Sequence, residues 1–271
     1  MPAFNAISPE QLARLIGTPA CPTIIDVRPD APELLPASRR YSIESITEWG
    51  STLGTKPTVV ACVHGKERST GAAALLRSEG VEAEILEGGF AAWRDAGLPV
   101  INAAKLPPKD AQGRTVWVTR ARPKVDRIAC PWLIRRFVDP AAVFLFVAPS
   151  EVAGVAERFG ATPFDVEGAY WSHRSELCTF DVMIEELGLS GFEALKRLAV
   201  IVRGADTARP QIAPQAAGLL AASLGLSRMH SDDLAQLEDG MIFYDAFYRW
   251  CRDAVDETHD WVSHARKRGR K

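Results

Sequence analysis

Hydrophobic and polar positions alternate in short blocks along the first hundred residues, and the spacing within each block predicts a helix or a strand. Brief, continuous apolar runs are typical of buried parallel strands. Longer stretches with apolar residues three or four apart predict helices. The expected strands lie at residues 22–28, 56–63 and 81–89, and the expected helices at residues 7–16, 42–53, 69–80 and 90–97. This alternation predicts a doubly wound parallel sheet whose ligands bind beyond the carboxyl ends of the strands.

A polar, breaker-rich stretch at residues 102–114 interrupts this pattern and predicts a domain boundary. We therefore divide the chain into a first domain at residues 1–104 and a second domain at residues 115–271. The second domain opens with strand-like runs at residues 115–120 and 141–148 and is otherwise mostly helical. The predicted fold class is an N-terminal α/β domain followed by a mixed α/β, mostly helical domain.

Two further segments complete the pattern. Residues 29–41 contain three prolines and few apolar repeats, and they predict a loop. A long final helix is expected from about Asp232 to His264, with a core stripe of apolar and aromatic residues three or four apart.

Charge and composition exclude several classes of function. The chain holds 32 Lys and Arg against 34 Asp and Glu, a net charge of −2, which does not favour nucleic acid as a partner. The basic end at residues 265–271 is expected to be a solvated tail. The sequence has no run of the roughly 18–20 apolar residues that a membrane span needs, and no signal-peptide pattern at its start. We expect a cytoplasmic protein without membrane partners, and its five scattered cysteines are expected to be reduced.

Cys62 stands at the end of the predicted strand at residues 56–63, before a short polar loop and a helix. A cysteine attacks only as thiolate, so its surroundings must lower its pKa. Inward-facing loop N–H groups and the positive end of the helix that begins near Ser69 would do so. Gly65 supplies the positive φ that such a turn requires. An ordinary buried core cysteine is the alternative, but the combined pattern favours a nucleophile.

The side chains around this loop add positive charge to the predicted cradle. His64 and Lys66 are cationic, and the planar guanidinium of Arg68 suits two oxygens of a tetrahedral oxyanion. The expected substrate-binding loop comprises Val63, His64, Gly65, Lys66, Glu67, Arg68 and Ser69.

Three segments of this first domain resemble successive signature segments of a rhodanese (sulfurtransferase) domain: "TIIDVR", "VVACVHGKERST" and "LEGGFAAWRDAGLPV". The resemblance covers about the first hundred residues. It implies a rhodanese-like doubly wound sheet in which Cys62 accepts a sulfane sulfur as a persulfide and passes it to a thiol or another acceptor. The partners would be a small sulfur donor and a thiol acceptor, and no cofactor is required. Asp26 and Arg28 match the early strand-end motif and would help hold the loop.

The sequence also departs from that family. After "DVR" it lacks the usual "GHIPGA" segment, and five residues separate Cys62 from Arg68 where single-turnover sulfurtransferases have four. The longer spacing is similar to that of rhodanese-like phosphatases and arsenate reductases, although Ala61 stands where those enzymes usually have histidine. Phosphate-sized oxyanions therefore stay open as substrates.

In the second domain, basic side chains crowd residues 120–136, with Asp126 among them and Asp139 shortly after. Arg122, Asp126, Arg127 and Arg135 are the candidate patch for an oxyanion or for an acidic partner surface. Helical spacing places Arg127 and Arg135 about two turns apart, roughly on one face. A salt-bridged solvent face is an equal alternative.

Metal-ligating residue types occur further along this domain: His173, Glu176, Cys178, Asp181 and Asp206. Imidazole and carboxylates suit iron, manganese or zinc, whereas a thiolate ligand shifts the preference toward zinc. The spacing is not a recognised chelate pattern, and a lone histidine is more often an ordinary surface or core residue. We take His173, Asp181 and Asp206 as the candidate metal site.

Residues from about Thr115 to Tyr248 resemble the chromate-resistance domain of ChrB-like proteins, above all in "RPKVDRIACPWLIRRFVDP". The resemblance implies a role in chromate tolerance, as a sensor, a regulator or an accessory enzyme. In that family His173, a carboxylate at 181, Asp206 and Asp245 have counterparts at matching positions.

Two classes of function follow from the sequence. The first is a sulfurtransferase coupled to a chromate-resistance domain, with a rhodanese-like phosphatase or arsenate reductase as the alternative enzyme. The second is a regulatory protein that responds to chromate or sulfate. A hybrid joins them, because chromate is a tetrahedral dianion like sulfate and a thiolate in the same pocket could reduce it. The pattern indicates no oligomeric state.

Overall fold

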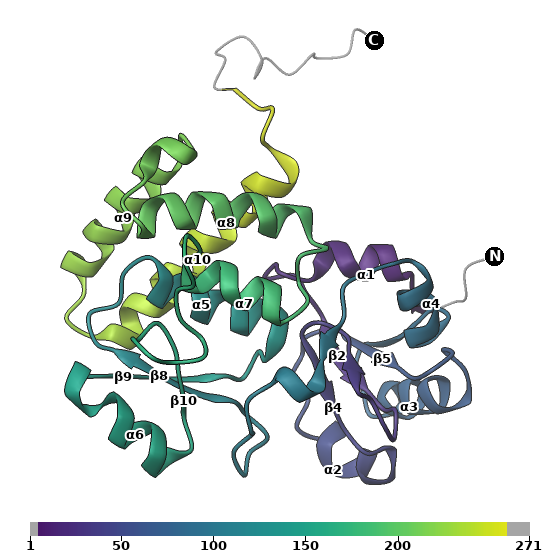
Figure 1. Cartoon of the computed structure of the whole chain (residues 1–271). Helices are drawn as coiled ribbons and strands as arrows, with labels where there is room; N and C mark the ends of the chain where they lie inside the picture. The colour runs from purple at the N-terminus through teal and green to yellow at the C-terminus, as the bar shows by residue number, and fades with distance from the viewer. Residues whose placement is uncertain (1–4, 259–271) are drawn as a thin grey trace, which may run out of the picture.

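The structure is a computed structural model that describes residues 5–258. Figure 1 shows two α/β units side by side, the first in purple and blue and the second in teal, green and yellow. None of the helices within the described part of the chain is both long and apolar enough to cross a membrane.

The first domain is built on a five-stranded sheet in which every neighbouring pair is parallel. The strands are β1 (Ala6–Ile7), β2 (Thr23–Asp26), β4 (Ser38–Arg40), β5 (Thr58–Ala61) and β6 (Ala83–Leu86). Their order is β1-β6-β5-β2-β4, so β5 is the central strand. The residue that follows β5 therefore lies in the middle of the carboxyl edge of the sheet, where open α/β sheets bind ligands.

Helices cover both faces of this sheet, which confirms the predicted doubly wound fold. The helices are α1 (Pro9–Leu15), α2 (Ile46–Gly50, after a 3₁₀ turn at Ile43–Ser45), α3 (Glu67–Ser78) and α4 (Gly89–Asp95). Successive strand residues point to opposite faces. Ile24 accordingly joins the core that contains α1 and α4, while Ile25 joins the core that contains α2 and α3.

The helix expected at residues 7–16 is confirmed, and its amino end is capped. The Oγ of Ser8 accepts a hydrogen bond from the N–H of Gln11, and the side chain of Gln11 reaches back to the N–H of Ser8. This capping box satisfies two N–H groups that the first turn of α1 would leave unpaired.

The predicted loop at residues 29–41 is wrong in part, because it contains two short strands. β3 (Glu33–Leu34) pairs antiparallel with β7 (Ile101–Asn102), and β4 extends the main sheet beyond β2. The sequence of β4 is Ser-Arg-Arg, which lacks the apolar pattern of a strand. Its position comes from pairing with β2 and not from its own residues.

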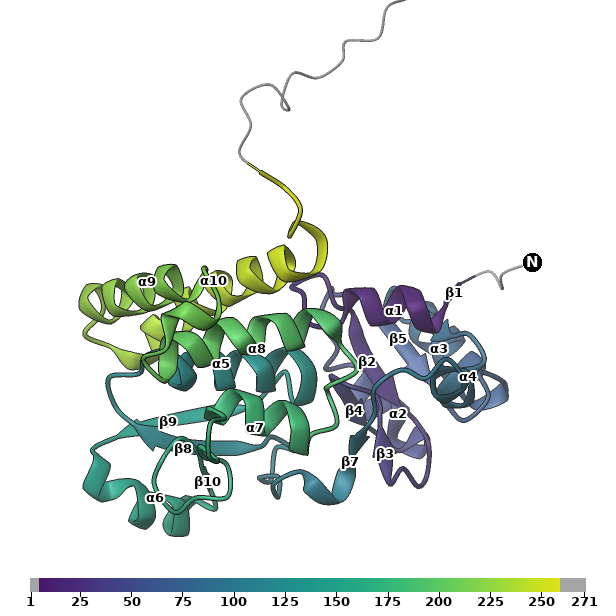
Figure 2. The ribbon, with the colours of Figure 1, turned by 45° about the horizontal axis from the view of Figure 1, so that its top comes forward.

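The second domain is a three-stranded parallel sheet under a layer of helices, with α6 on the opposite face (Figures 1 and 2). Its strands, in the order β10-β8-β9, are β8 (Val116–Arg120), β9 (Val143–Val147) and β10 (Thr162–Pro163). Its helices are α5 (Asp126–Leu133), α6 (Val152–Phe159), α7 (Thr179–Glu186), α8 (Glu193–Asp206), α9 (Ala216–Met229) and α10 (Asp233–Asp253). Short 3₁₀ turns lie at Ala103–Lys105, Pro149–Glu151 and Pro210–Ile212. The expected mixed, mostly helical domain is confirmed.

One helix of the second domain is interrupted, and the final helix is shorter than predicted. Pro131 lies inside α5, and the chain continues past it as a π-helical turn at Ile134–Val138, since proline removes one backbone donor. The final helix ends at Asp253, well before the predicted His264, which lies outside the described residues. The basic tail at 265–271 also lies outside them.

One apolar core spans the boundary between the domains. Gly17 adopts a φ of +83°, and a Cβ at this position would overlap the Phe137 ring and approach Tyr248 at 2.8 Å. The N–H of Ala37 donates to the carbonyl oxygen of Phe137 at 2.6 Å. Residues of α1, α4, α5, α8 and α10 belong to the same buried cluster. The two units are therefore packed against each other and not only linked by the chain.

Candidate functional site

The loop after β5 wraps around Cys62, the first residue beyond the carboxyl end of that strand. The Cys62 side chain is buried, with 5% of the residue exposed, and lies at the edge of the core beneath α2 and α3. Its Sγ is 3.1 Å from the Oγ of Ser69 in the first turn of α3. The backbone N–H groups of Ser69, Lys66 and His64 also hydrogen-bond to the sulfur. The predicted inward-facing turn is thus present.

These contacts decide the protonation of Cys62. Burial by itself raises the pKa of the thiol, because a thiolate loses hydration when it is buried. The Ser69 hydroxyl and the backbone N–H groups of the loop outweigh burial, and the pKa of Cys62 lies below its ordinary value. By contrast, burial raises the pKa of Cys21 and of Cys251 to about 11. Among these three thiols, Cys62 is the one whose surroundings favour the reactive anion.

Two glycines allow the loop to close. Gly65 adopts a φ of +65°, and a Cβ there would lie 2.7 Å from a backbone carbonyl oxygen. Gly89, at the start of α4, has a φ of +64° and would place a Cβ 2.5 Å from the carbonyl oxygen of Cys62. The N–H of Phe90 donates to that same oxygen at 2.9 Å. The first turn of α4 therefore braces the back of the Cys62 loop. Sequence reasoning gave the double glycine no role, although such a pair directly after a strand signals close backbone approach.

Asp26 and Arg28 form a buried ion pair at the carboxyl end of β2. The Nη2 of Arg28 lies 2.6 Å from the Oδ2 of Asp26, and their side chains are 5% and 0% exposed. The same guanidinium lies 3.6 Å from the centre of the Phe90 ring and donates to the carbonyl oxygen of Glu33. The pair thereby ties the end of β2 to α4, which braces the Cys62 loop.

The remaining loop side chains are turned outward. Val63, His64, Lys66 and Glu67 are all exposed, whereas Ser69 is buried. Arg68 lies on the rim, with its side chain 43% exposed and its Nη2 3.5 Å from Glu44. Arg68 also lines a cavity of about 420 Å³ together with Arg28 and Arg40. Three arginines thus share a cavity whose lining does not include Cys62, while backbone dipoles and Ser69 surround the sulfur.

A second concentration of ionisable groups lies where the amino ends of α5 and α7 meet the carboxyl end of α8. The Nε2 of His173 lies 3.1 Å from Asp206, 3.4 Å from Asp165 and 3.5 Å from Asp126. We call these four residues the His173 cluster. Asp126 is fully buried, and its Oδ2 accepts a hydrogen bond from the N–H of Thr179, the first residue of α7.

Burial and proximity shift the titration of this cluster. Desolvation raises the pKa of Asp126 to about 7. The facing carboxyl groups of Asp126, Asp165 and Asp206 raise the pKa of His173 to about 12. For Asp165, burial is more than offset by hydrogen bonds with His173 and Thr179, so the pKa of Asp165 is lowered. The cluster concentrates negative charge around one imidazole.

Comparison with known proteins assigns each half of the chain. Residues 8–96 match the family model for the rhodanese-like domain, and residues 117–251 match that for the C-terminal domain of ChrB. The chain joins a rhodanese-like domain to a ChrB C-terminal domain. Over 152 residues, 54% of its length, it is 32% identical to Protein ChrB of Cupriavidus metallidurans. That match spans 44% of the relative, less than half of its length.

Several solved structures are similar to the rhodanese-like domain. A rhodanese-related protein from Thermoplasma volcanium is 27% identical over 36% of this chain and 98% of its own, with a TM-score of 0.33. A rhodanese homologue from Thermus thermophilus is 32% identical over 32% of this chain and 96% of its own, with a TM-score of 0.28. A thiosulfate sulfurtransferase from Pseudomonas aeruginosa is 26% identical over 36% of this chain and 19% of its own, with a TM-score of 0.33.

The structure divides the predicted metal ligands of the ChrB C-terminal domain. It brings His173 and Asp206 together but places Asp181 elsewhere. Asp181 accepts the N–H of Cys178 at 3.1 Å and pairs with Arg203 at 3.0 Å. Asp126, which the sequence assigned to the basic patch, takes its place beside His173. Asp165 was missed, because its neighbours along the chain carry no ligand pattern and only the fold brings it to His173.

The predicted oxyanion patch is not gathered on one surface. Arg122 donates to the carbonyl oxygens of Ser227 and His230. Arg127 lies 3.3 Å from Asp165. Arg135 pairs with Glu238 at 2.6 Å. Arg127 and Asp126 therefore meet in the His173 cluster, whereas Arg122 and Arg135 point into two other networks.

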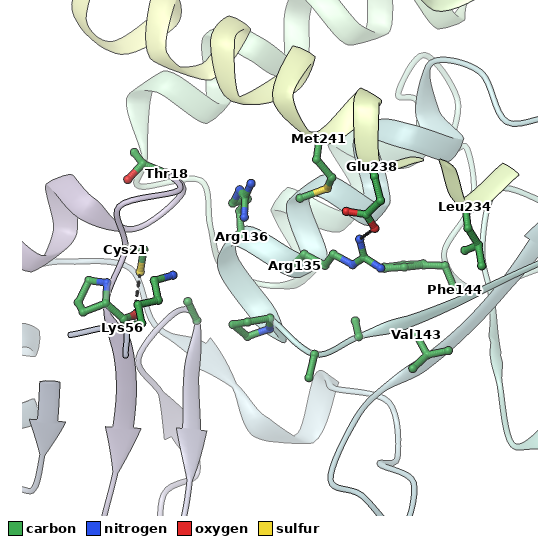
Figure 3. Close-up of a pocket in the computed structure, with 15 residues that line it drawn as sticks. Thr18, Cys21, Lys56, Arg135, Arg136, Val143, Phe144, Leu234, Glu238 and Met241 are labelled. Atoms are coloured by element: carbon green, nitrogen blue, oxygen red, sulfur yellow. Dashed lines mark hydrogen bonds and ion pairs between the residues drawn. The ribbon is translucent and has the colours of Figure 1, made fainter. Parts of the chain in front are cut away.

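Arg135 also lines a cavity of about 600 Å³ between the two domains. Figure 3 shows Cys21 and Lys56 of the rhodanese-like domain on one side, and Arg135, Arg136 and Glu238 of the ChrB C-terminal domain on the other. Glu238 and Asp245 neutralise the two arginines by direct pairing. Lys56 is therefore the cation of this cavity left with no ion pair among residues 5–258.

Proposed function

We propose that the rhodanese-like domain is a sulfurtransferase that carries sulfur as a persulfide on Cys62. The observation that supports this most directly is the sulfur's environment: a hydroxyl and three backbone N–H groups hydrogen-bond to Cys62 and lower its pKa. A thiolate held in a ring of donors is the nucleophile that sulfur transfer requires.

The first half-reaction uses thiosulfate or a low-molecular persulfide as donor. The Cys62 thiolate attacks the sulfane sulfur of thiosulfate, and a new S–S bond forms at Sγ. The bond between the sulfane sulfur and the sulfite sulfur breaks, and sulfite leaves with that electron pair. Donors that surround Sγ stabilise the charge of the attacking sulfur before the reaction and of the persulfide afterwards.

The second half-reaction regenerates the free thiolate of Cys62. A thiolate acceptor attacks the outer sulfur of the persulfide, and the S–S bond to Cys62 breaks. Cys62 leaves as a thiolate, which the same hydroxyl and N–H groups stabilise as leaving group. No cofactor enters either step, and no side chain of the loop must act as a general base.

A turnover assay with thiosulfate and a small thiol acceptor tests this proposal. We expect sulfite release by the intact chain and none by Cys62→Ser, while Cys21→Ser retains the activity because Cys21 lies in the separate interdomain cavity. Sulfite release by Cys62→Ser equal to that of the unmodified chain would contradict the proposal.

A second candidate activity follows from the rim. Five residues separate Cys62 from Arg68, and Arg68 shares a cavity with Arg28 and Arg40, which favours a tetrahedral oxyanion as substrate. Hydrolysis of an aryl phosphate, or reduction of arsenate with a thiol co-substrate, without any transfer from thiosulfate would favour this alternative.

The physiological role that we propose is chromate tolerance. The similarity of residues 117–251 to the ChrB C-terminal domain supports it. Sulfur transfer on Cys62 would serve this role in the cytoplasm, with sulfate or chromate as oxyanion ligands of the loop. A regulatory protein that responds to these oxyanions is the alternative. Growth on chromate with the intact gene and with a Cys62→Ser gene separates them, because a regulator that does not use the thiol would protect equally in both strains.

A further inference from the structure

The His173 cluster presents one imidazole nitrogen to three carboxyl groups. A single ring nitrogen can donate one hydrogen, yet the Nε2 of His173 lies within 3.1–3.5 Å of Asp206, Asp165 and Asp126. One N–H cannot satisfy three carboxylates that converge on it. The point where the three carboxyl groups converge therefore lacks enough positive charge to balance them.

Asp126 shows this shortage most clearly. The residue is 0% exposed, and its Oδ1 has no hydrogen-bond partner among residues 5–258. The other oxygen of the same carboxyl group accepts from Thr179 and lies 3.5 Å from His173. A buried acceptor with no partner costs about 1–3 kcal/mol, more if it is charged. A bound ion is one physical explanation for such an unpaired buried group.

The spacing of the side chains fits a cation. The candidate ligand atoms of Asp126, His173 and Asp206 all lie within 4.8 Å of one another. Cation–ligand bonds of about 2.1 Å place neighbouring ligand atoms roughly 3.0–3.4 Å apart in octahedral or tetrahedral geometry. The distances from His173 to Asp206 and to Asp126 are 3.1 and 3.5 Å. Small side-chain adjustments therefore suffice to bring all three groups onto one ion.

We propose that Asp126, His173 and Asp206 bind one divalent first-row transition cation, Mn²⁺ or Fe²⁺, in the second domain. This inference is independent of sulfur transfer on Cys62. Imidazole with two carboxylates favours such ions over Ca²⁺ and Mg²⁺, which prefer oxygen ligands alone. No thiolate belongs to the set, so the ligand that most strongly favours zinc over Mn²⁺ and Fe²⁺ is missing.

Asp165 has a different task in the cluster. Its Oδ1 accepts the hydroxyl of Thr179, and its Oδ2 lies 3.3 Å from both Arg120 and Arg127. Arg120 and Arg127 thus already balance the negative charge of Asp165, and Asp165 acts as a positioning residue beside the ion. Three protein ligands leave coordination positions free, and the His173 side chain is 41% exposed. Water or an external ligand can therefore reach the ion from the side of His173.

Titration of the full chain with Mn²⁺ tests the site. We expect one Mn²⁺ bound per chain. Electron paramagnetic resonance measures the free Mn²⁺ during the titration, and elemental analysis after dialysis measures the bound ion. His173→Ala and Asp206→Asn should each weaken binding on the order of 100-fold or more. Both residues are partly exposed, so these changes disturb folding less than a change at buried Asp126.

His230→Ala supplies the matched control. His230 also pairs with a carboxylate, Asp239, at 2.8 Å, but no further aspartate contacts it among the described residues. This variant should bind Mn²⁺ like the unmodified chain. The thermal midpoint gives a second readout: Mn²⁺ should raise it for the unmodified chain and for His230→Ala, but not for His173→Ala. Absence of stoichiometric Mn²⁺, or equal binding by His173→Ala, would overturn the proposal.

Discussion

Removal of the Ser69 hydroxyl should destabilise the thiolate form of Cys62 while the loop around it keeps its conformation. Ser69 is fully buried, and its Oγ lies 3.1 Å from the Sγ of Cys62. A hydrogen bond to a charged group contributes about 1.5–3 kcal/mol. Since 1.4 kcal/mol is a factor of ten, Ser69→Ala should lower the thiolate fraction on the order of 10- to 100-fold at a pH where the thiol is mostly protonated.

The effect has a defined dependence on pH. Reactivity of Cys62 rises with pH as the thiol loses its proton, and hydrogen bonds from Ser69 and the loop lower the pKa that sets the midpoint in the unmodified chain. Loss of the hydroxyl raises the pKa and moves this midpoint upward. The difference in Cys62 reactivity between the unmodified chain and Ser69→Ala is therefore largest at low pH. It disappears at a pH where Cys62 is ionised in both proteins.

The assay measures how fast iodoacetamide alkylates Cys62, with the modified site located by mass spectrometry. It covers about pH 5 to pH 10, the range over which thiols titrate. Cys21 and Cys251 should label slowly, because burial raises the pKa of each to about 11. Thr70→Ala, at the exposed neighbouring position, is the control and should behave like the unmodified chain. An unchanged midpoint in Ser69→Ala would refute the proposed role of the hydroxyl.

Five further outcomes are expected. Gly89→Ala should destabilise the protein by about 2–4 kcal/mol and reduce sulfur transfer, because its Cβ would meet backbone atoms. Gly97 has a similar φ of +66° but open space around it, so Gly97→Ala should lower the free energy of unfolding in urea by only about 1–2 kcal/mol. Asp26→Ala should cost about 3–5 kcal/mol in the same experiment, since it leaves a buried guanidinium unpaired, and a loss below 1 kcal/mol would contradict this. Gly17→Ala should lower the midpoints of both domains together in calorimetry, and a shift of one transition alone would contradict the shared core. If chromate is reduced in the same pocket, Cys62→Ser should abolish chromate consumption by the purified chain, and unchanged consumption would rule this reduction out.

Short-range patterns made the first domain predictable from sequence. Continuous apolar runs such as residues 58–61 determine buried parallel strands, and Ser8 with Gln11 determines where α1 begins. The place of the candidate nucleophile Cys62 also follows from local order, because a cysteine directly after a central strand must stand at the carboxyl edge of the sheet. Gly65 could be assigned for the same reason, since the tight turn requires its positive φ.

Features that depend on distant contacts were not predictable. Asp126 and Asp165 are 39 positions apart, and only the meeting of the α5 and α7 amino ends brings them to His173. Asp181 was a candidate ligand because of its residue type and the ChrB-like resemblance, yet the fold uses it for the α7 amino end and Arg203. Similarly, β4 forms because β2 offers an open edge, although its own sequence has no strand pattern.

Mass spectrometry of the intact chain after thiosulfate treatment tests the role of Cys62 most directly. Without an acceptor, the chain should gain the mass of one sulfur atom, located on Cys62, and should release one sulfite for each sulfur gained. Cys62→Ser should gain nothing, and a thiol added afterwards should remove the sulfur from the unmodified chain. An unmodified chain that stays at its original mass at a pH where Cys62 is alkylated rapidly would contradict persulfide chemistry at this loop.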